Sequence, residues 1–189
     1  MESTIEEYVT ETKIEQVTDA KPGELEVDET AENTYIINSI EDLVFFSHDV
    51  TNGNTYEGKT VKLGLSLDFN SNKSYVDPLR TDYGQYGYDG ELKTLLTSGE
   101  GFKIIQGEFA GIFDGKGKSI YNLYINIEDD EDFKSVGLFS INKGTIKNLE
   151  LFNSNVEFVS KNYAIAGNVV GDNYGMIDNC YSSRKNMWN

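Results

Sequence analysis

The side chains that most often carry chemistry are scarce in this sequence. His48 is the only histidine, and its context, SHDV, differs from the HExxH pattern of zinc peptidases. Cys180 is the only cysteine, so neither a second imidazole nor a thiol pair completes a zinc site. We therefore predict no catalytic residue, no metal site and no cofactor. We expect His48 to be a surface or partly packed helix residue and Cys180 to be a small buried apolar residue.

Two acidic features admit a functional interpretation beside a simpler one. Residues 128–132 are consecutive acids that could bind calcium, but their spacing differs from that of an EF-hand and the run contains no glycine. Asp114, in FDGKG, could be the acid of a carbohydrate-active enzyme, but Asp-Gly is also typical of tight turns. No second acid stands at a spacing that pairs with Asp114. A solvated turn is the preferred interpretation for both features.

A tyrosine-rich stretch is the best candidate for ligand binding. Tyrosine offers a flat apolar face and a hydroxyl group, which suit stacking on sugars or filling pockets in proteins. We therefore name Tyr83, Tyr86 and Tyr88 as candidate ligand-binding residues. The alternative is that this stretch only packs over the flank of the fold.

The acidic composition limits the classes of partner. The chain has 189 residues and a formal net charge of −16, so nucleic acid, itself a polyanion, is not an expected partner. No apolar run approaches about 18 residues, so we expect no membrane insertion. The N-terminus lacks the pattern of a signal peptide. Either the protein stays inside the cell, or this chain is a mature or truncated piece of an exported protein.

Charge and periodicity divide the chain into a tail and one domain. Residues 1–33 carry eleven acids against two lysines, a composition typical of disorder, and the domain is expected over residues 34–189. Ser39 and Asp42 form a predicted capping box, and apolar residues at helical spacing then predict a capping helix over 39–51.

The segment after this helix is predicted to contain a strand and a loop. Strict alternation of apolar residues predicts one strand over 59–69. Residues 70–103, which include the candidate tyrosines, interrupt the pattern and are expected to form an insertion loop. Repeated sequence follows over residues 107–183.

The repeats share a short phrase: an aliphatic residue, any residue, asparagine and a second apolar residue. The asparagines are Asn122, Asn148 and Asn179, which lie 26 and then 31 residues apart, and this spacing indicates stacked units of chain. Asparagine has one acceptor and two donors and tolerates turn conformations, so we predict a ladder of these three residues at buried corners. Gly144 and Gly175, each four residues before an asparagine, are predicted to adopt positive φ angles.

The sequence VGLFSINKGTIKNL in this region resembles the GLUG-motif repeats of bacterial surface adhesins and of some IgA-cleaving metallopeptidases. The upstream segments SIEDLVFFSHDVTNG, KTVKLGLSLDF and FAGIFDGKGKSIYNL extend the resemblance to about residues 35–183. It implies an all-β fold, a right-handed parallel β-helix (solenoid), with the helix over 39–51 as an N-terminal cap. Ser140 departs from the glycine that ends the motif. The peptidase activity is not implied, because its residues are absent.

These observations favour a non-enzymatic module that serves adhesion, ligand binding or spacing. The resemblance implies a secreted or surface bacterial protein, extracellular in location, with a host glycan or host protein as partner. We expect a monomer. The first alternative is a carbohydrate-active β-helix enzyme acting on polysaccharide, and the second is a stalk segment within a longer chain.

Overall fold

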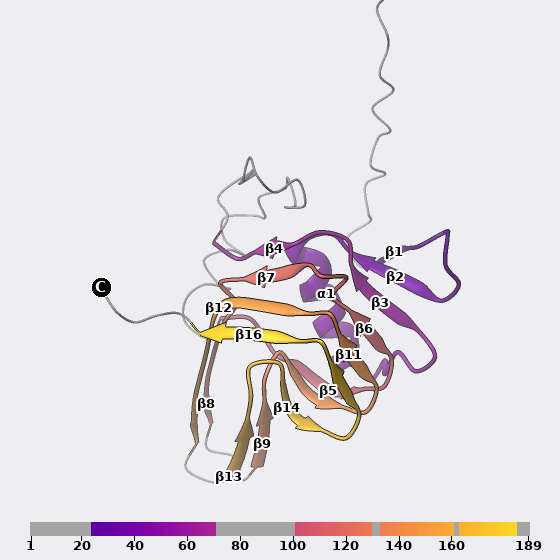
Figure 1. Cartoon of the computed structure of the whole chain (residues 1–189). Coiled ribbons are helices and arrows are strands. Elements are labelled where there is room, and N and C mark those ends of the chain that lie inside the picture. The colour runs from indigo at the N-terminus through magenta and orange to yellow at the C-terminus, as the bar shows by residue number, and fades with distance from the viewer. Residues whose placement is uncertain (1–23, 71–100, 130–132, 161–162, 185–189) are drawn as a thin grey trace, which may run out of the picture.

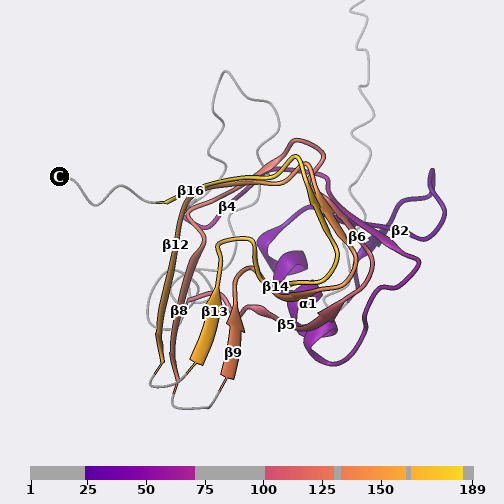
Figure 2. The same cartoon turned by 60° about the horizontal axis from the view of Figure 1, so that its bottom comes forward.

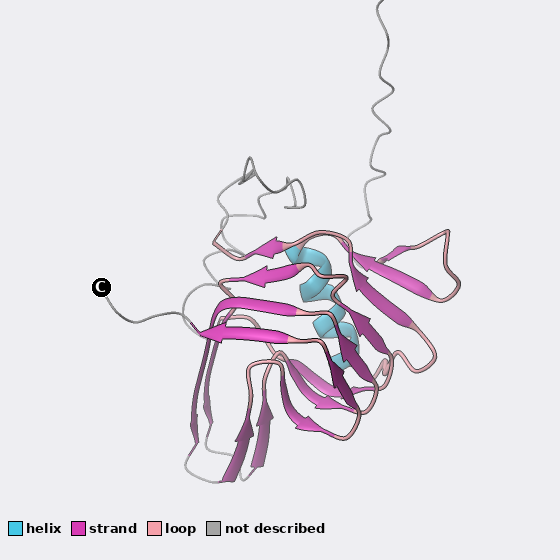
Figure 3. Cartoon of the chain, in the orientation of Figure 1, coloured by secondary structure: helices cyan, strands magenta, loops and turns pink. Residues whose placement is uncertain are grey.

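The computed structural model describes residues 24–70, 101–129, 133–160 and 163–184 (Figure 1). Within these ranges, no helix is long and apolar enough to cross a membrane. One helix and three larger sheets make up the described structure, and two short strand pairs extend from them (Figures 1 and 3).

The largest sheet, called here the β15 sheet, is parallel except at its first strand. Strand β1 pairs antiparallel with β2, and every later pair is parallel. In spatial order its strands are β1 (Glu26–Val27), β2 (Thr34–Ile37), β3 (Thr60–Leu63), β6 (Ile112–Asp114), β11 (Thr145–Lys147) and β15 (Met176–Asp178).

Two further sheets, the β14 sheet and the β16 sheet, are entirely parallel. The β14 sheet contains, in spatial order, β5 (Ile105–Phe109), β10 (Phe139–Asn142) and β14 (Val170–Asn173). The β16 sheet contains β4 (Leu67–Asp68), β7 (Ser119–Tyr121), β12 (Glu150–Ser160) and β16 (Tyr181–Arg184). The outlying pairs are β8 (Tyr124–Asp129) with the second half of β12, and β9 (Phe133–Val136) with β13 (Tyr163–Ala166).

Helix α1 (Ile40–Thr51) begins at the predicted capping box. The Ser39 hydroxyl accepts a hydrogen bond from the Asp42 backbone N–H at 3.0 Å, and the Asp42 carboxylate accepts one from the Ser39 N–H at 3.0 Å. These bonds satisfy N–H groups that a helix start leaves without partners. The buried side of the helix consists of Ile40, Leu43, Phe46, Ser47 and Val50.

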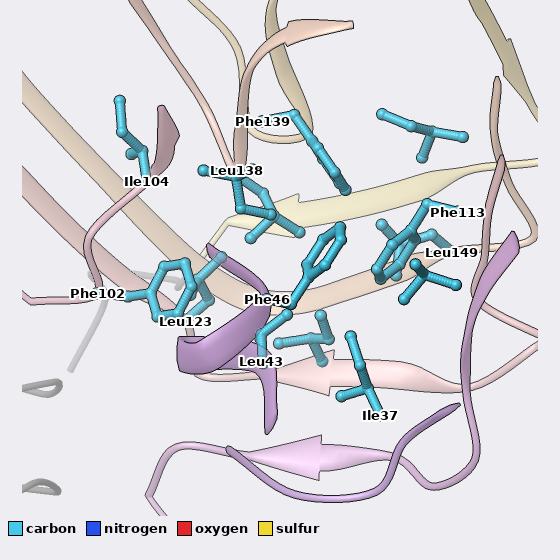
Figure 4. Packing of buried hydrophobic residues seen from close by; sticks show 14 of the residues in the cluster. Ile37, Leu43, Phe46, Phe102, Ile104, Phe113, Leu123, Leu138, Phe139 and Leu149 are labelled. Carbon is cyan, nitrogen blue, oxygen red and sulfur yellow. The ribbon is translucent and has the colours of Figure 1, made fainter. Parts of the chain in front are cut away.

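The core lies around this helix. Phe46 is fully buried, and its ring centroid lies 5.7 to 6.2 Å from the rings of Phe113, Phe109 and Phe139, which belong to β6, β5 and β10 (Figure 4). Figure 2 shows the sheets curling around α1. Burial of large apolar side chains from both the helix and the sheets is the main stabilising term of such a core.

The predicted all-β, right-handed parallel β-helix is therefore wrong. The fold is mixed α/β, with several parallel sheets that form a half-barrel curl around a helix (Figure 2). The prediction assumed that strand residues alone fill the interior, with the helix as an outer cap. Instead, Leu43 and Phe46 are fully buried and belong to the same core cluster as the strand residues. Sequence periodicity reports how often strands recur, and not where a helix packs against them.

The predicted strand over 59–69 is two strands in different sheets. Val61 and Leu63 in β3 and Leu67 in β4 are buried as the alternation predicts, but Leu65 is only half-buried and Ser66 is buried. The chain therefore turns a corner between the two strands. A larger residue than Gly64 would overlap the Asn38 side chain at this corner.

The folded part also begins earlier than the predicted boundary at residue 34. Strand β1 lies inside the predicted acidic tail, and Leu25 is buried in the core cluster. Lys62 forms an ion pair with Asp28, and its hydrogen bond is the main cause that lowers the pKa of Asp28 to about 2. Residues 24–33 therefore pack onto the domain through one strand, one leucine and one ion pair.

Candidate functional site

The three predicted corner asparagines form two ladders instead of one. Asn179 donates from Nδ2 to Oδ1 of Asn148 at 2.9 Å, and Asn148 donates in the same way to Asp114 at 3.0 Å. Asn122 belongs to another corner, where it donates to Asp68 at 2.7 Å and accepts from Asn153. The strand register explains the separation, because β11 pairs with β6 whereas β7 pairs with the start of β12.

These asparagines are corner residues because of their backbone conformation. Asn122, Asn148, Asn153 and Asn179 have φ angles of 57°, 51°, 55° and 48°, in the left-handed region that asparagine tolerates better than other residues with a Cβ. The predicted burial is wrong, because Asn122 and Asn148 are half-buried and Asn179 is exposed.

The buried amide is that of Asn142. Its side chain is fully buried, donates to Oδ1 of Asn173 at 2.7 Å and accepts from the Gly144 N–H at 3.1 Å. Gly144 and Gly175 do not have the predicted positive φ angles. Their reason is close approach, because a Cβ on Gly144 would overlap the Gly111 carbonyl and a Cβ on Gly175 would overlap that of Gly144.

Asp114 is held as a structural carboxylate. It is buried, and its oxygens accept from the Lys116 backbone N–H at 2.9 Å and from Asn148, with the Lys147 ammonium at 3.6 Å. Burial alone raises the pKa of Asp114, but these hydrogen bonds together with the charges of Lys147 and Lys116 lower the pKa below its usual value. A carboxyl group kept ionised in this way favours the predicted turn role over that of a general acid.

The other predicted candidates have varied outcomes. Tyr83, Tyr86 and Tyr88 lie outside the described residues, as do residues 130–132 of the acidic run. His48 is exposed on α1, with Asn52 Nδ2 at 2.9 Å from its Nδ1. Cys180 is half-buried, and burial raises the pKa of its thiol. The described residues contain no group of three or more His, Cys, Asp or Glu side chains that could hold a metal ion.

An aromatic ridge on the outer face of the β16 sheet is a feature that the sequence analysis missed. We use this name for Tyr121, Phe152 and Tyr181, which come from β7, β12 and β16. The rings of Tyr121 and Phe152 are stacked, with centroids 5.5 Å apart and planes 15° apart, and Phe152 and Tyr181 lie 5.3 Å apart at 47°. Ile120 and Leu151 next to them are fully buried, so alternation places the ridge on the outer face.

Polar groups lie on both sides of the ridge. Asn122 and Asn153, the residues that follow Tyr121 and Phe152, present amides at the neighbouring corner. On the other side, the Ser119 hydroxyl donates to the Glu150 carboxylate at 2.8 Å. Asp68 pairs in register with Tyr121 and so lies at one end of the ridge. The surface therefore combines apolar rings with amide and carboxylate groups.

The ridge could have been found from the sequence only with the correct register. Tyr121 and Phe152 become neighbours once Leu151 is aligned with Ile120, a shift of 31 residues. Comparisons with protein-family models, with curated proteins and with solved structures find no match to this chain. The ridge and its flanks are therefore the observations from which we infer a function.

Proposed function

We propose that this chain is a non-enzymatic binding module and that its aromatic ridge contacts a neutral glycan. The observation that carries the proposal is the row of three rings on an outer sheet face, with amides beside it. Sugar rings present apolar C–H faces and peripheral hydroxyl groups. Aromatic rings bind the first, and the amides of Asn122 and Asn153 suit the second.

The charge of the surface favours a neutral ligand. The whole chain has a formal net charge of −16, and the carboxylates of Asp68 and Glu150 stand beside the ridge. An anionic glycan would be repelled by both, because like charges at short range disfavour association. The proposed ligand is accordingly a polysaccharide or oligosaccharide without carboxylate or sulfate groups.

Tyr181 is the expected anchor of this contact. The facing surfaces of Tyr121 and Phe152 are already used against each other, so a ligand reaches mainly their edges. Tyr181 stands at the end of the row and is 53% exposed, which leaves one ring face for stacking. Large aromatic anchors commonly carry most of the free energy of such contacts.

The proposal places the chain in a secreted or surface bacterial protein, where glycans are available, with a host glycan as the partner. A second candidate function is that of a spacer. The hydrogen-bonded side chains that join successive strands at the corners favour it, because each of them holds neighbouring repeats in register. A spacer needs no ligand, so glycan binding separates the two functions.

The test is binding of the full chain to a panel of neutral and anionic glycans. We expect retention by a neutral glycan, and Tyr181→Ala should weaken the affinity by about tenfold, the change that corresponds to about 1.4 kcal/mol. Tyr174→Ala is the matched control, because Tyr174 is 70% exposed but lies outside the ridge. Equal losses for the two variants, or no retention by any neutral glycan, would contradict the proposal.

A further inference from the structure

The last three described strands form one open edge. Strands β14, β15 and β16 are each the last strand of their sheet, and each pairs on one side only among the described residues, with β10, β11 and β12 respectively. The opposite end is covered differently, by the antiparallel strand β1 and by α1 (Figure 1). Exposed parallel edges are sites at which a further strand can pair.

An apolar column ends at this edge without cover. Val61, Phe113, Ile146 and Ile177 stand in register on successive strands of the β15 sheet. The first three are fully buried, whereas Ile177 is 43% exposed. Met176, beside Ile177, is 59% exposed. The position above Ile177 therefore suits an aliphatic side chain.

A column of charges gives the edge a chemical preference. Lys62, Asp114, Lys147 and Asp178 occupy one register position on β3, β6, β11 and β15, and their signs alternate. The Lys147 ammonium lies 3.6 Å from Asp114 within this column. Asp178, the last member, is exposed at the edge. Opposite charges on neighbouring strands attract each other, so the position above Asp178 suits lysine or arginine.

The corner ladder adds a third preference. Oδ1 of Asp114 accepts from Asn148, and Oδ1 of Asn148 accepts from Asn179. The same pattern makes Oδ1 of Asn179 the acceptor for one further amide. An asparagine would supply that amide and would also tolerate the left-handed corner conformation.

We propose that the edge formed by β14, β15 and β16 binds an extended, repeat-like polypeptide segment that adds parallel strands. Its central strand carries an aliphatic residue above Ile177, a cation above Asp178 and an asparagine above Asn179. Within this chain, Ile146-Lys147-Asn148 has that pattern. The inferred partner is therefore a segment of the same repeat type, and this surface is separate from the outer face used by the glycan.

The probe for the test is a synthetic peptide of the sequence FSINKGTIKNLELFNS, which corresponds to residues 139–154. Binding to the full chain is measured by fluorescence anisotropy. We expect saturable binding that Asp178→Lys weakens by about fivefold, and similar weakening when the peptide lysine that corresponds to Lys147 is replaced by glutamate. Combining the two charge reversals should restore the affinity to within about twofold.

Glu57→Lys is the matched control, because it makes the same change at an exposed carboxylate on the loop before β3. It should leave peptide binding unchanged, and Asp178→Asn should give an intermediate affinity. Circular dichroism checks that each variant is folded. Absence of peptide binding, equal effects of Asp178→Lys and Glu57→Lys, or failure of the double reversal to restore affinity would overturn the proposal. Sedimentation that shows the edge occupied by a second copy of the chain would overturn it too.

Discussion

Phe46→Ala tests whether α1 is a core element of the fold. Phe46 is fully buried, and its ring contacts three phenylalanines from three different strands and Tyr56. Truncation removes the apolar surface of the ring and leaves a cavity between the helix and the sheets. Substitutions of this kind cost about 3–5 kcal/mol, which is a large part of the stability of an ordinary domain. For a domain of this size the melting temperature should fall by about 10 °C.

Phe45→Ala is the matched control for this experiment. Phe45 is the neighbouring residue of the same helix, so the change in helix propensity is the same, but its side chain is only half-buried. We expect a cost of about 1–2 kcal/mol for Phe45→Ala, because less surface is buried and water fills the space. Urea unfolding at 25 °C measures both free energies. Should Phe46→Ala unfold the chain outright, Phe46→Leu, with an expected cost of about 1 kcal/mol, keeps the comparison measurable.

The result that would refute the reasoning is a cost for Phe46→Ala no larger than that for Phe45→Ala. Such a result would mean that α1 covers the end of the sheets loosely and that their interior is stable without it. The predicted capping role of the helix would then describe its energetics better than the packing does. A difference of about 2 kcal/mol or more supports the helix as part of the core.

Three further predictions concern the corners, the acid limb of stability and the thiol. Asn148→Ala should lower the free energy of unfolding by about 2 kcal/mol, measured by urea unfolding, because it loses the bond to Asp114 and places alanine at a φ of 51°. Asn148→Gly, which accepts that φ, should cost about half as much, and equal costs would contradict the backbone argument. The pKa of Asp28 is lowered to about 2 in the folded state, so its contribution is full above about pH 4 and is lost as the pH falls toward 2. Asp28→Asn should therefore flatten the dependence of the free energy of unfolding on pH between 4 and 2, and an unchanged slope would show that the ion pair with Lys62 does not matter. Cys180 should react with iodoacetamide more slowly than free cysteine at pH 8, because burial raises the pKa of its thiol and shields it, and a rate equal to that of free cysteine would be inconsistent with this.

Local features of the fold could be predicted from the sequence where a few neighbouring residues determine them. The start of α1 follows from Ser39 and Asp42, whose two reciprocal hydrogen bonds involve residues only three apart. The burial of Val61 and Leu63 follows from alternation, and the corner role of Asn148 follows from its tolerance of left-handed φ angles. None of these conclusions requires knowledge of a distant partner.

Features that depend on distant partners could not be predicted in this way. The position of Phe46 among rings from three strands requires the path of the whole chain, which apolar spacing along one helix does not contain. The ridge was missed for a similar reason, because Tyr121 and Phe152 are ordinary outward residues until the register makes them neighbours. Attention went instead to Tyr83, Tyr86 and Tyr88, which are close in sequence and lie outside the described residues.

The register itself follows from one spacing that the asparagine phrase conceals. Three hydrogen-bonded amide pairs, Asn142 with Asn173, Asn148 with Asn179 and Asn153 with Asn122, each join residues 31 positions apart. The 26-residue interval between Asn122 and Asn148 joins two different corners, and it produced the wrong ladder. A repeat of constant length places equivalent corners above one another, because strand and corner lengths are then conserved from one unit to the next. Alignment at 31 residues also brings Tyr121 beside Phe152 and Lys147 beside Asp178, so the ridge and the charge column both result from the same repeat length. A segment that binds at the open edge must follow the same spacing from β14 through β16, which is why a peptide taken from the preceding repeat is the sharpest probe.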